Sequence, residues 1–275
     1  MKIKPQIIRK LRRLNIVLAD TVCEKNLIQK HRNYQEFIIL CRSRTGSNFL
    51  VNLLQSHEQI RASGEIFTGQ KRMDWGYPIS IPEESLSLRE TDPLEFIARV
   101  IFRETSKSVL AVGFKLFYYQ AKKGKQESIW TYLQNKKKLK IIHLTRKNIL
   151  KTHLSRQLAK TTKTWVNTKM QDTSGEVKSI FLDYEGCLQA FQDTKRMKKQ
   201  YREFFSEHSI LEVVYEELVK NQEEETKRIQ DFLGVKNKIL YASTEKQSKQ
   251  PLSQTISNYE ELKEKFSNTA WSSFF

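Results

Sequence analysis

Four short apolar runs, with helix-patterned segments between them, restrict the folds that this chain can adopt. The runs are Glu36–Cys41, Ser108–Phe114, Lys140–Leu144 and Ile210–Tyr215. Each has the length of a strand and is rich in the apolar and β-branched residues that buried strands favour. Strands that alternate with helices predict a mainly parallel sheet with helices on both faces. The sequence therefore predicts an α/β fold of three layers.

The helical patterns are consistent with a single domain. The expected helices are Ser47–Gln55, Asp92–Arg103, Glu176–Phe205 and Glu223–Leu233, the last closed by Gly234. Asp92 and Pro93 are residues typical of an N-cap and a first helical position. Residues 69–91 contain glycine and prolines among polar residues and predict an irregular excursion. No linker divides the chain, so we expect one domain at 36–275 after a basic, helical N-terminal segment at 1–35.

The charge of the chain indicates an anionic partner. Its 275 residues include 48 Lys and Arg against 31 Asp and Glu, a formal net charge of +17. Such an excess suits a nucleotide, a nucleic acid, an anionic lipid or a polyanionic glycan. Residues 1–32 hold nine of the basic residues and only two acidic ones. This stretch is either a solvated helix face or a peripheral contact with an anionic membrane or glycan, and its few aromatic residues argue against nucleic acid.

The cysteines and the hydropathy indicate in which cellular compartment the protein resides. Cys23, Cys41 and Cys187 are odd in number and widely spaced, which predicts neither a disulfide framework nor a zinc site. No apolar stretch approaches the roughly 18 residues of a membrane span, and the N-terminus lacks the pattern of a cleaved signal. We expect a cytoplasmic protein that its basic N-terminus could hold at the inner membrane surface.

The loop after the first apolar run has the composition of an anion site. It reads Arg42-Ser43-Arg44-Thr45-Gly46-Ser47-Asn48-Phe49 and opens a helix. Backbone N–H groups around Gly46 and at the helix N-terminus can surround a phosphate or sulfate, with Arg44, Thr45 and Ser47 completing the site. The alternative is an ordinary turn in which Ser47 is only the helix N-cap.

The ATP- and GTP-binding loop G-x-x-x-x-G-K-[ST] is absent. Ser47 and Asn48 follow Gly46, and Cys41 stands where the first glycine of that pattern would be. Thr145 and Arg146 follow the third apolar run, where a P-loop NTPase often has an aspartate that holds a metal ion. The residues therefore predict an anion site without Mg²⁺ or another metal.

These residues resemble the sulfotransferases that use 3′-phosphoadenosine 5′-phosphosulfate (PAPS), and in particular the bacterial carbohydrate branch of the trehalose and Nod-factor type. Residues 44–49 match the family's 5′-phosphosulfate loop, with Asn48 in place of the usual hydroxyl residue. Arg146 and Ser155 match the arginine and serine of its 3′-phosphate site. Further similar stretches are Gly64–Phe67, Gly113–Leu116 and the late nucleotide-closing loop at Lys249–Gln254. Together they extend from about residue 36 to the C-terminus.

The resemblance implies a P-loop-like, three-layer domain that transfers a sulfuryl group from PAPS to a hydroxyl and releases 3′-phosphoadenosine 5′-phosphate (PAP). The residues expected to bind the donor are Arg44, Thr45, Gly46, Ser47, Asn48, Phe49, Arg146, Ser155 and Lys249. For catalysis, it implies Arg44 at the departing phosphate, Lys115 at the sulfuryl oxygens or the acceptor, and Glu65 as the base. His57 is the second candidate for the base, with His143 and His153 behind it.

The acceptor is less defined by the sequence. A carbohydrate, a glycolipid or another hydroxyl compound fits the resemblance, and a homodimer stays open. Aromatic residues near the expected site could stack on sugar rings: Trp75, Tyr77, Phe117, Tyr118, Tyr119 and Trp165. The alternatives to a sulfotransferase are a small-metabolite kinase on the same fold, a non-catalytic module that binds polyanions or membranes, and a sulfotransferase-like protein without turnover.

Overall fold

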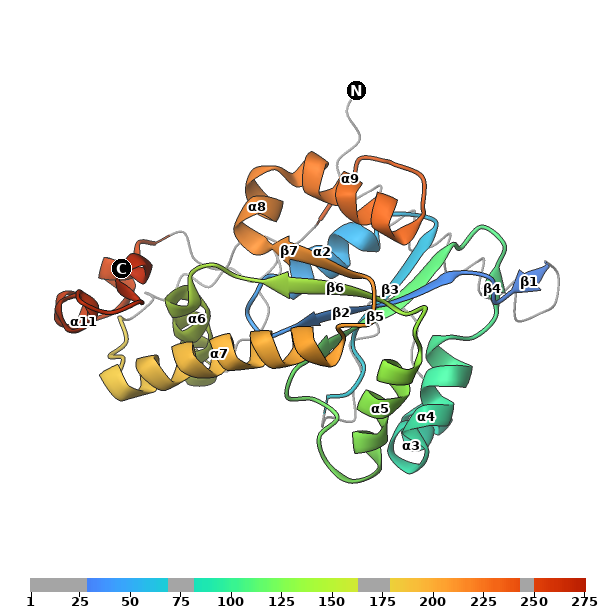
Figure 1. The fold of residues 1–275 in the computed structure, drawn as a ribbon, viewed down its shortest axis with the longest axis horizontal. Helices are drawn as coiled ribbons and strands as arrows, with labels where there is room; N and C mark the ends of the chain where they lie inside the picture. The colour runs from blue at the N-terminus through green and yellow to red at the C-terminus, as the bar shows by residue number, and fades with distance from the viewer. Residues whose placement is uncertain (1–28, 69–81, 163–178, 243–249) are drawn as a thin grey trace.

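A parallel sheet of five strands forms the centre of the molecule (Figure 1). The computed structural model describes residues 29–68, 82–162, 179–242 and 250–275. The sheet has the strand order β3-β5-β2-β6-β7, with bounds β2 Gln35–Cys41, β3 Ile60–Glu65, β5 Ala111–Phe117, β6 Lys140–Thr145 and β7 Ile210–Val214. A second, two-stranded sheet pairs β1 (Lys30–His31) antiparallel with β4 (Thr105–Ser106).

Helices cover both faces of the large sheet, as the alternating pattern predicts (Figure 1). On one face lie α2 (Ser47–Leu54), α8 (Tyr215–Lys220) and α9 (Gln222–Leu233). On the other lie α3 (Glu83–Thr91), α4 (Pro93–Phe96), the π-helical turn η1 (Ile97–Ile101), α5 (Ser128–Asn135) and α7 (Tyr184–Phe204). The remaining helices are η2 (Gly124–Glu127), α6 (Ile149–Thr162), α10 (Leu252–Thr255), α11 (Tyr259–Phe266) and η3 (Ser272–Phe274).

Strand β2 shows why the apolar runs are continuous. Phe37, Ile39 and Cys41 pack into the core on the α2 side, and Ile38 and Leu40 pack into the core on the α5 side. All five side chains are buried, since a central parallel strand has no face in contact with solvent. Each such side chain contributes about 1.5–3 kcal/mol of burial free energy, which fixes β2 at the centre of the sheet.

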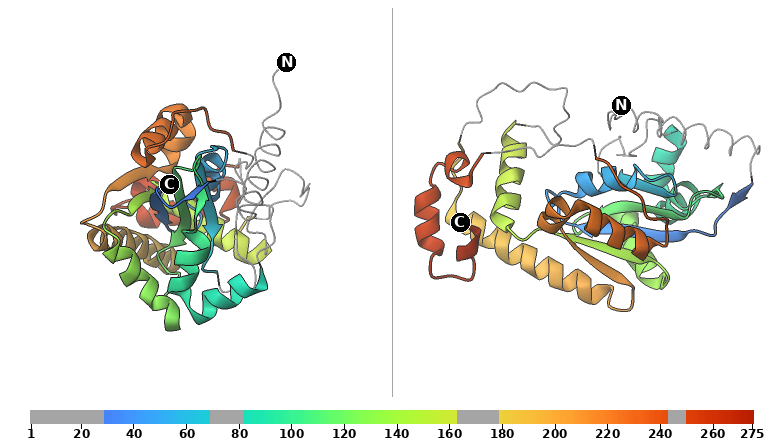
Figure 2. Two further views of the ribbon diagram at one scale, coloured as in Figure 1. Left: turned by 90° about the vertical axis from the view of Figure 1, so that its right-hand side faces the viewer. Right: turned by 90° about the horizontal axis from the view of Figure 1, so that it is seen from above.

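A third apolar cluster, outside the two sheet faces, supports α6. It joins Leu154 of α6 and Phe191 of α7 to Phe266 of α11, and Figure 2 shows these helices together at one end of the molecule. The Asn148 side chain, just before α6, donates from Nδ2 to the carbonyl oxygen of Phe274 at 2.8 Å. The C-terminal segment therefore holds α6 in position beside the sheet.

The structure confirms most predicted elements and corrects others. The sheet has a strand that the pattern analysis missed, β3. The second predicted strand lies three residues later, at Ala111–Phe117, and Tyr215 begins α8 instead of ending a strand. The helix predicted from Asp92 ends in the π-helical turn at Ile101.

The long predicted helix from Glu176 begins only at Tyr184 in the described residues. The Asp183 carboxylate caps this helix by accepting from the Gly186 N–H at 2.7 Å. The prediction for α9, closed by Gly234, is confirmed.

The N-terminal segment is described only from residue 29. There Lys30–His31 is a strand and Gln35 begins β2, so this part of the predicted helical segment is extended. The rest of the segment and most of the excursion at 69–91 lie outside the described residues, and the division at residue 35 stays a prediction. Within the described ranges, no helix has the length and apolar character to cross a membrane.

Candidate active site

The loop between β2 and α2 has the backbone of an anion cradle. Arg44 and Gly46 both have positive φ angles, 68° and 87°. Gly46 is the N-cap residue of α2, no side chain caps the helix there, and Ser47 is already its first residue. The alternative in which Ser47 is the N-cap is therefore wrong. The first N–H groups of α2 have no capping side chain, which is the arrangement that binds anions.

Gly46 is required by packing as well as by its backbone angle. A Cβ atom at this position would lie 2.0 Å from Cδ2 of Tyr215. The same tyrosine ring contacts Phe49 edge-on, with centroids 6.5 Å apart, and lies 5.0 Å from the guanidinium carbon of Arg146. Tyr215 thus packs against both the cradle and the arginine at the end of β6.

Arg44, Arg146 and Ser155 meet at the carboxyl edge of the sheet, as the resemblance implied. Arg44 Nε donates to Ser155 Oγ at 2.9 Å, and Arg146 Nη1 donates to the Arg44 carbonyl oxygen at 3.1 Å. Burial lowers the pKa of both guanidinium groups, and the positive charge of Arg146 lowers that of Arg44 further. Two cations held this close favour an anion between or beside them.

Arg146 keeps hydrogen-bonding capacity for a ligand. Its Nε is buried and has no hydrogen-bond acceptor in the part of the chain that the structure describes. The Glu216 carboxylate is an ionic neighbour, with Oε1 at 3.7 Å from that nitrogen. A buried donor without an acceptor is costly in a folded protein, and a bound phosphate would remove that cost.

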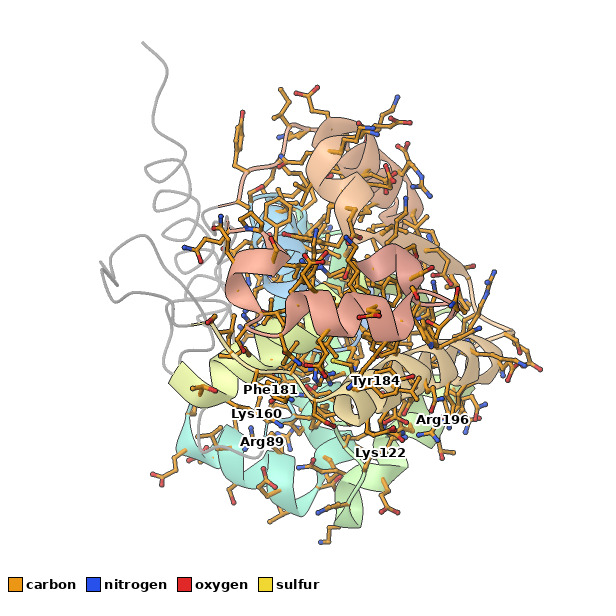
Figure 3. The ribbon with its side chains drawn as sticks, turned by 90° about the vertical axis from the view of Figure 1, so that its left-hand side faces the viewer. Arg89, Lys122, Lys160, Phe181, Tyr184 and Arg196 are labelled. Atoms are coloured by element: carbon orange, nitrogen blue, oxygen red, sulfur yellow. The ribbon has the colours of Figure 1, made fainter. Side chains whose placement is uncertain are left out.

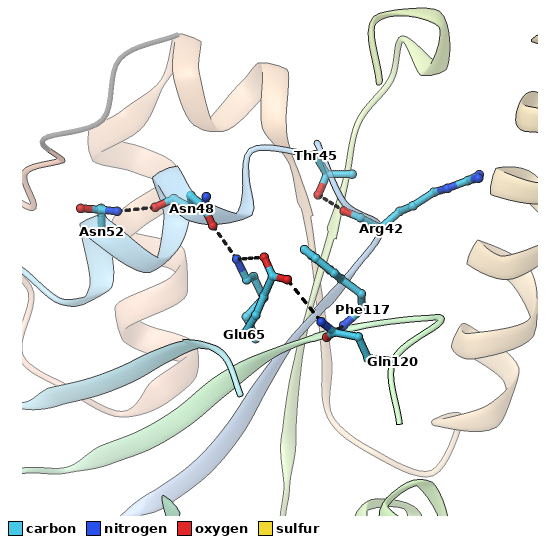
Figure 4. Close-up of polar contacts among 8 residues, drawn as sticks. Arg42, Thr45, Asn48, Asn52, Glu65, Phe117 and Gln120 are labelled. Atoms are coloured by element: carbon cyan, nitrogen blue, oxygen red, sulfur yellow. Dashed lines mark hydrogen bonds and ion pairs between the residues drawn. The ribbon is translucent and has the colours of Figure 1, made fainter. Parts of the chain in front are cut away.

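A second polar cluster lies beside the cradle (Figure 4). Lys115, whose side chain is fully buried, places Nζ 3.0 Å from Oε1 of Glu65 and 2.5 Å from Oδ1 of Asn48. Gln120 Nε2 donates to the other carboxylate oxygen of Glu65 at 3.3 Å, and Gln120 Oε1 accepts from the Phe117 N–H at 2.9 Å. The carboxylate that the sequence analysis proposed as the base is therefore held from two sides.

A β-bulge in β3 brings Glu65 to this cluster. The pairing register of β3 with β5 shifts between Ser63 and Glu65, so that Glu65 lies directly opposite Lys115. Without the extra residue at Gly64, strict alternation would put Glu65 on the other face of the sheet from Lys115. The bulge thus places Glu65 beside Lys115, near the carboxyl ends of two neighbouring strands.

The two hydroxyl residues of the cradle have internal partners. Thr45 Oγ1 donates to the Arg42 carbonyl oxygen at 2.8 Å, and the hydroxyls of Thr45 and Ser47 both hydrogen-bond the Cys41 thiol. Burial raises the pKa of that thiol to about 11, so Cys41 is an inert core residue. Lys249, predicted to bind the donor, lies outside the described residues.

His57 is not part of this cluster. It follows the end of α2, and because α2 starts at the carboxyl edge and runs back along the sheet, His57 lies near the opposite edge. Its side chain is 1% exposed. Nδ1 accepts from the Gln59 N–H at 3.0 Å, so Nε2 carries the proton and donates to the Lys236 carbonyl oxygen at 2.7 Å. This geometry favours a structural role over the catalytic one considered from the sequence.

We expect His57→Ala to lower stability and leave catalysis nearly unchanged. Losing both backbone contacts leaves buried groups unpaired and should lower the free energy of unfolding by about 1–3 kcal/mol, measured by urea denaturation. The kcat for sulfuryl transfer should change less than about twofold. A much larger loss of kcat in a folded variant would return His57 to the list of catalytic candidates.

His143 and most aromatic candidates also have core roles. His143 donates from Nδ1 to Glu212 at 3.0 Å and accepts from the Tyr118 hydroxyl at 2.5 Å. Tyr118 and Phe117 are buried, whereas Tyr119 is 48% exposed and its hydroxyl bonds Ser43 in the cradle loop. Tyr119 is therefore the aromatic candidate that remains at the site. Trp75, Tyr77 and Trp165 lie outside the described residues.

Sequence reasoning missed Gln120 and the role of Tyr215. Tyr215 directly follows β7 and Gln120 lies three residues after β5, both at the carboxyl edge of the sheet, where ligands bind in such folds. Position relative to the strand ends was the only available signal, because neither residue type indicates a phosphate site by itself.

Comparison with known proteins identifies the family. Residues 36–238 match the model of the sulfotransferase family, and the chain belongs to this family, in its PAPS-dependent class. It is 27% identical over 246 residues to Nodulation protein H of Rhizobium meliloti strain 1021, covering 88% of this chain and 95% of that protein. The corresponding protein of Rhizobium tropici is 25% identical over 248 residues, covering 88% and 93%.

The structure was also compared with solved structures. The crystal structure of a sulfotransferase from Alicyclobacillus acidocaldarius superposes with a TM-score of 0.46 at 16% identity, covering 84% of this chain and 90% of that one. The resemblance inferred from the cradle residues is confirmed by the family match, which leaves the kinase alternative without support.

Proposed function

We propose that this protein transfers the sulfuryl group of PAPS to a hydroxyl of a carbohydrate or glycoconjugate. The observation that carries the proposal is the meeting of Arg44, Arg146 and Ser155, which come from separate parts of the sequence, beside the Lys115–Glu65 ion pair. The similarity to Nodulation protein H supports an oligosaccharide acceptor.

The residues present fit a nucleotide that carries phosphate groups at both its 3′ and 5′ positions. The uncapped start of α2 and Arg44 would hold the 5′ end. Arg146, with its unused Nε, and Ser155 would hold the 3′-phosphate. Gly46, which leaves no room for a Cβ beside Tyr215, lets the backbone of the cradle pack closely against that ring. Lys249 remains a predicted nucleotide contact.

The Lys115–Glu65 pair supplies the groups that the transfer needs. PAPS provides a sulfuryl group on a good leaving group. Glu65 would take the proton of the acceptor hydroxyl. The hydroxyl oxygen would bond to the sulfur in line with the bond that breaks between the sulfur and the phosphate oxygen of PAPS. Lys115 and Arg44 would stabilise the negative charge that develops on the sulfuryl oxygens and on the departing phosphate. Asn48 and Gln120 orient the two reacting side chains by accepting from Lys115 and donating to Glu65.

Transfer without a metal ion stays a prediction. In the described ranges, no group of three or more His, Cys, Asp and Glu side chains could hold a metal. The sulfuryl group carries less charge than a γ-phosphoryl group, so arginine, lysine and backbone N–H groups suffice to stabilise it. Binding and transfer in excess EDTA test this directly.

Calorimetric titration of PAP against ADP, in EDTA and at moderate salt, tests the donor site. We expect wild type to bind PAP at least tenfold more tightly than ADP, because only PAP carries the 3′-phosphate. Arg146→Ala should lose at least about tenfold in PAP affinity and most of the preference over ADP. Arg99→Ala, which removes an exposed arginine of η1 paired with Glu95, is the control and should bind PAP normally. Equal affinity of wild type for PAP and ADP would contradict the proposal.

A further inference from the structure

Beyond the donor site, a second group of cations lies at the same edge of the sheet. Arg42 leaves the end of β2 in a direction away from Glu65 (Figure 4) and is only 8% exposed. Its Nη1 donates to the Ala190 carbonyl oxygen at 3.1 Å and to Thr194 Oγ1, both on α7. Its Nε has no hydrogen-bond acceptor among the residues that the structure describes. Arg42 is thus anchored, buried and still able to donate.

Arg156 of α6 faces the same place. Its Nε is also buried, and within the described ranges it has no acceptor. Burial and the positive charge of Arg42 lower the pKa of Arg156 to about 10, so Arg156 is charged at neutral pH. His153 lies one turn earlier on α6, and its Nδ1 is 3.5 Å from Nη2 of Arg156. Burial and the charges of Arg156, Arg42 and Lys160 lower the pKa of His153 to about 4, so it is neutral and adds a polar group.

The protein compensates this charge only in part. The nearby carboxylate that raises the pKa of both arginines is Asp193, and Asp193 already pairs with Arg196 at 2.7 Å. Figure 3 shows Lys160 of α6 and Arg196 of α7 on the same side of the molecule. A buried and a partly buried guanidinium group, each with a buried and unused Nε donor, share one carboxylate that is already engaged. This arrangement is unfavourable unless an anion binds there.

The position of these cations assigns them to the acceptor side. On α6, Ser155 faces Arg44 at the donor site, whereas Arg156 is the next residue and points about 100° away around the helix. Tyr119 connects the two regions, because the charges of both Glu65 and Arg156 act on its hydroxyl. An anion near Arg156 would therefore lie across Tyr119 from Glu65, on a part of the acceptor away from the reacting hydroxyl.

We propose that Arg42 and Arg156 bind an anionic group of the acceptor, so that the preferred substrate is an acidic saccharide. The anion, a carboxylate or a phosphate or sulfate ester, would sit on a part of the molecule other than the carbon that bears the reacting hydroxyl, since Arg42 points away from Glu65. This inference rests on the proposed function, and the test keeps the two apart.

The test is binding of matched saccharides to the PAP-loaded protein. N-acetylchitotetraose and hyaluronan tetrasaccharide both contain N-acetylglucosamine but only the second carries uronates; trehalose and trehalose 6-phosphate differ by one phosphate ester. We expect at least one acidic partner to bind wild type about tenfold or more tightly than its neutral counterpart. The pair that shows the difference identifies the anion as a carboxylate or a phosphate ester.

Arg156→Gln should remove this preference and leave PAP affinity and neutral saccharide binding unchanged, and Arg156→Lys should retain part of it. Lys151→Gln removes the same charge from an exposed position of α6 and should behave as wild type. The inference is wrong if a PAP-binding protein binds no acidic saccharide better than its neutral partner, if both Gln variants lose affinity equally, or if Arg156→Gln loses PAP. Failure of wild type to bind PAP would instead contradict the proposed function.

Discussion

Glu65→Gln is expected to lower kcat for sulfuryl transfer by about 10²–10⁴-fold, which corresponds to about 3–5 kcal/mol of transition-state stabilisation. The amide keeps the size of the carboxylate and can still accept from Lys115, but it cannot take the proton of the acceptor hydroxyl. PAP affinity should stay within about threefold of wild type, because the expected phosphate contacts come from Arg44, Arg146 and Ser155.

The measurement is single-turnover transfer from PAPS, with PAP binding followed by calorimetry. Glu36→Gln is the matched control: Glu36 pairs with Lys136 at 2.5 Å, and its side chain is 24% exposed against 27% for Glu65. Glu36 lies at the amino end of β2, away from the site, and should retain full kcat. If the two variants lost activity alike, or if Glu65→Gln kept its rate, Glu65 would not be the base.

The strands that the sequence predicted are those with apolar runs, at the centre of the sheet for β2, β5 and β6 and at its edge for β7. β2 has five consecutive apolar residues from Phe37 to Cys41, and β7 reads Ile-Leu-Glu-Val-Val. β3, at the other edge of the sheet, reads Ile-Arg-Ala-Ser-Gly-Glu. Such a mixture of small and polar residues matches no strand pattern. Its neighbours along the chain gave no further signal, so the fifth strand became visible only through its pairing with β5.

The residues of the site also divide into those that a local sequence pattern could assign and those that it could not. Arg44 and Arg146 could be assigned because each directly follows a predicted strand, and parallel strands bring those ends to one edge. The contact of Glu65 with Lys115 depends on a bulge of one residue at Gly64, which no local pattern encodes. His57 is close to the cradle in the sequence but not in space, because the eight residues of α2 lead from the cradle to the opposite edge of the sheet.

Gly46→Ala is expected to reduce both the stability of the fold and the affinity for PAP. A residue with a Cβ at a φ of 87° is strained by about 1–2 kcal/mol. The Cβ would also overlap the Tyr215 ring, and relieving such a contact costs about 1–3 kcal/mol. The free energy of unfolding should therefore fall by about 3 kcal/mol. Because Tyr215 also packs on Phe49 and Arg146, we expect PAP affinity to fall at least about 30-fold.

Gly234→Ala separates the two causes of this loss. Gly234 has a similar φ of 74°, and among the described residues nothing lies within 4 Å of the position of its Cβ. It should lose only the backbone component, about 1 kcal/mol, and bind PAP as wild type does, when both variants are compared by urea denaturation and calorimetry. Equal destabilisation of the two variants would mean that Tyr215 yields to the added methyl group. If PAP affinity were unchanged in Gly46→Ala, the ligand would not depend on the conformation of this loop. The assignment of the loop as the anion cradle would then be contradicted.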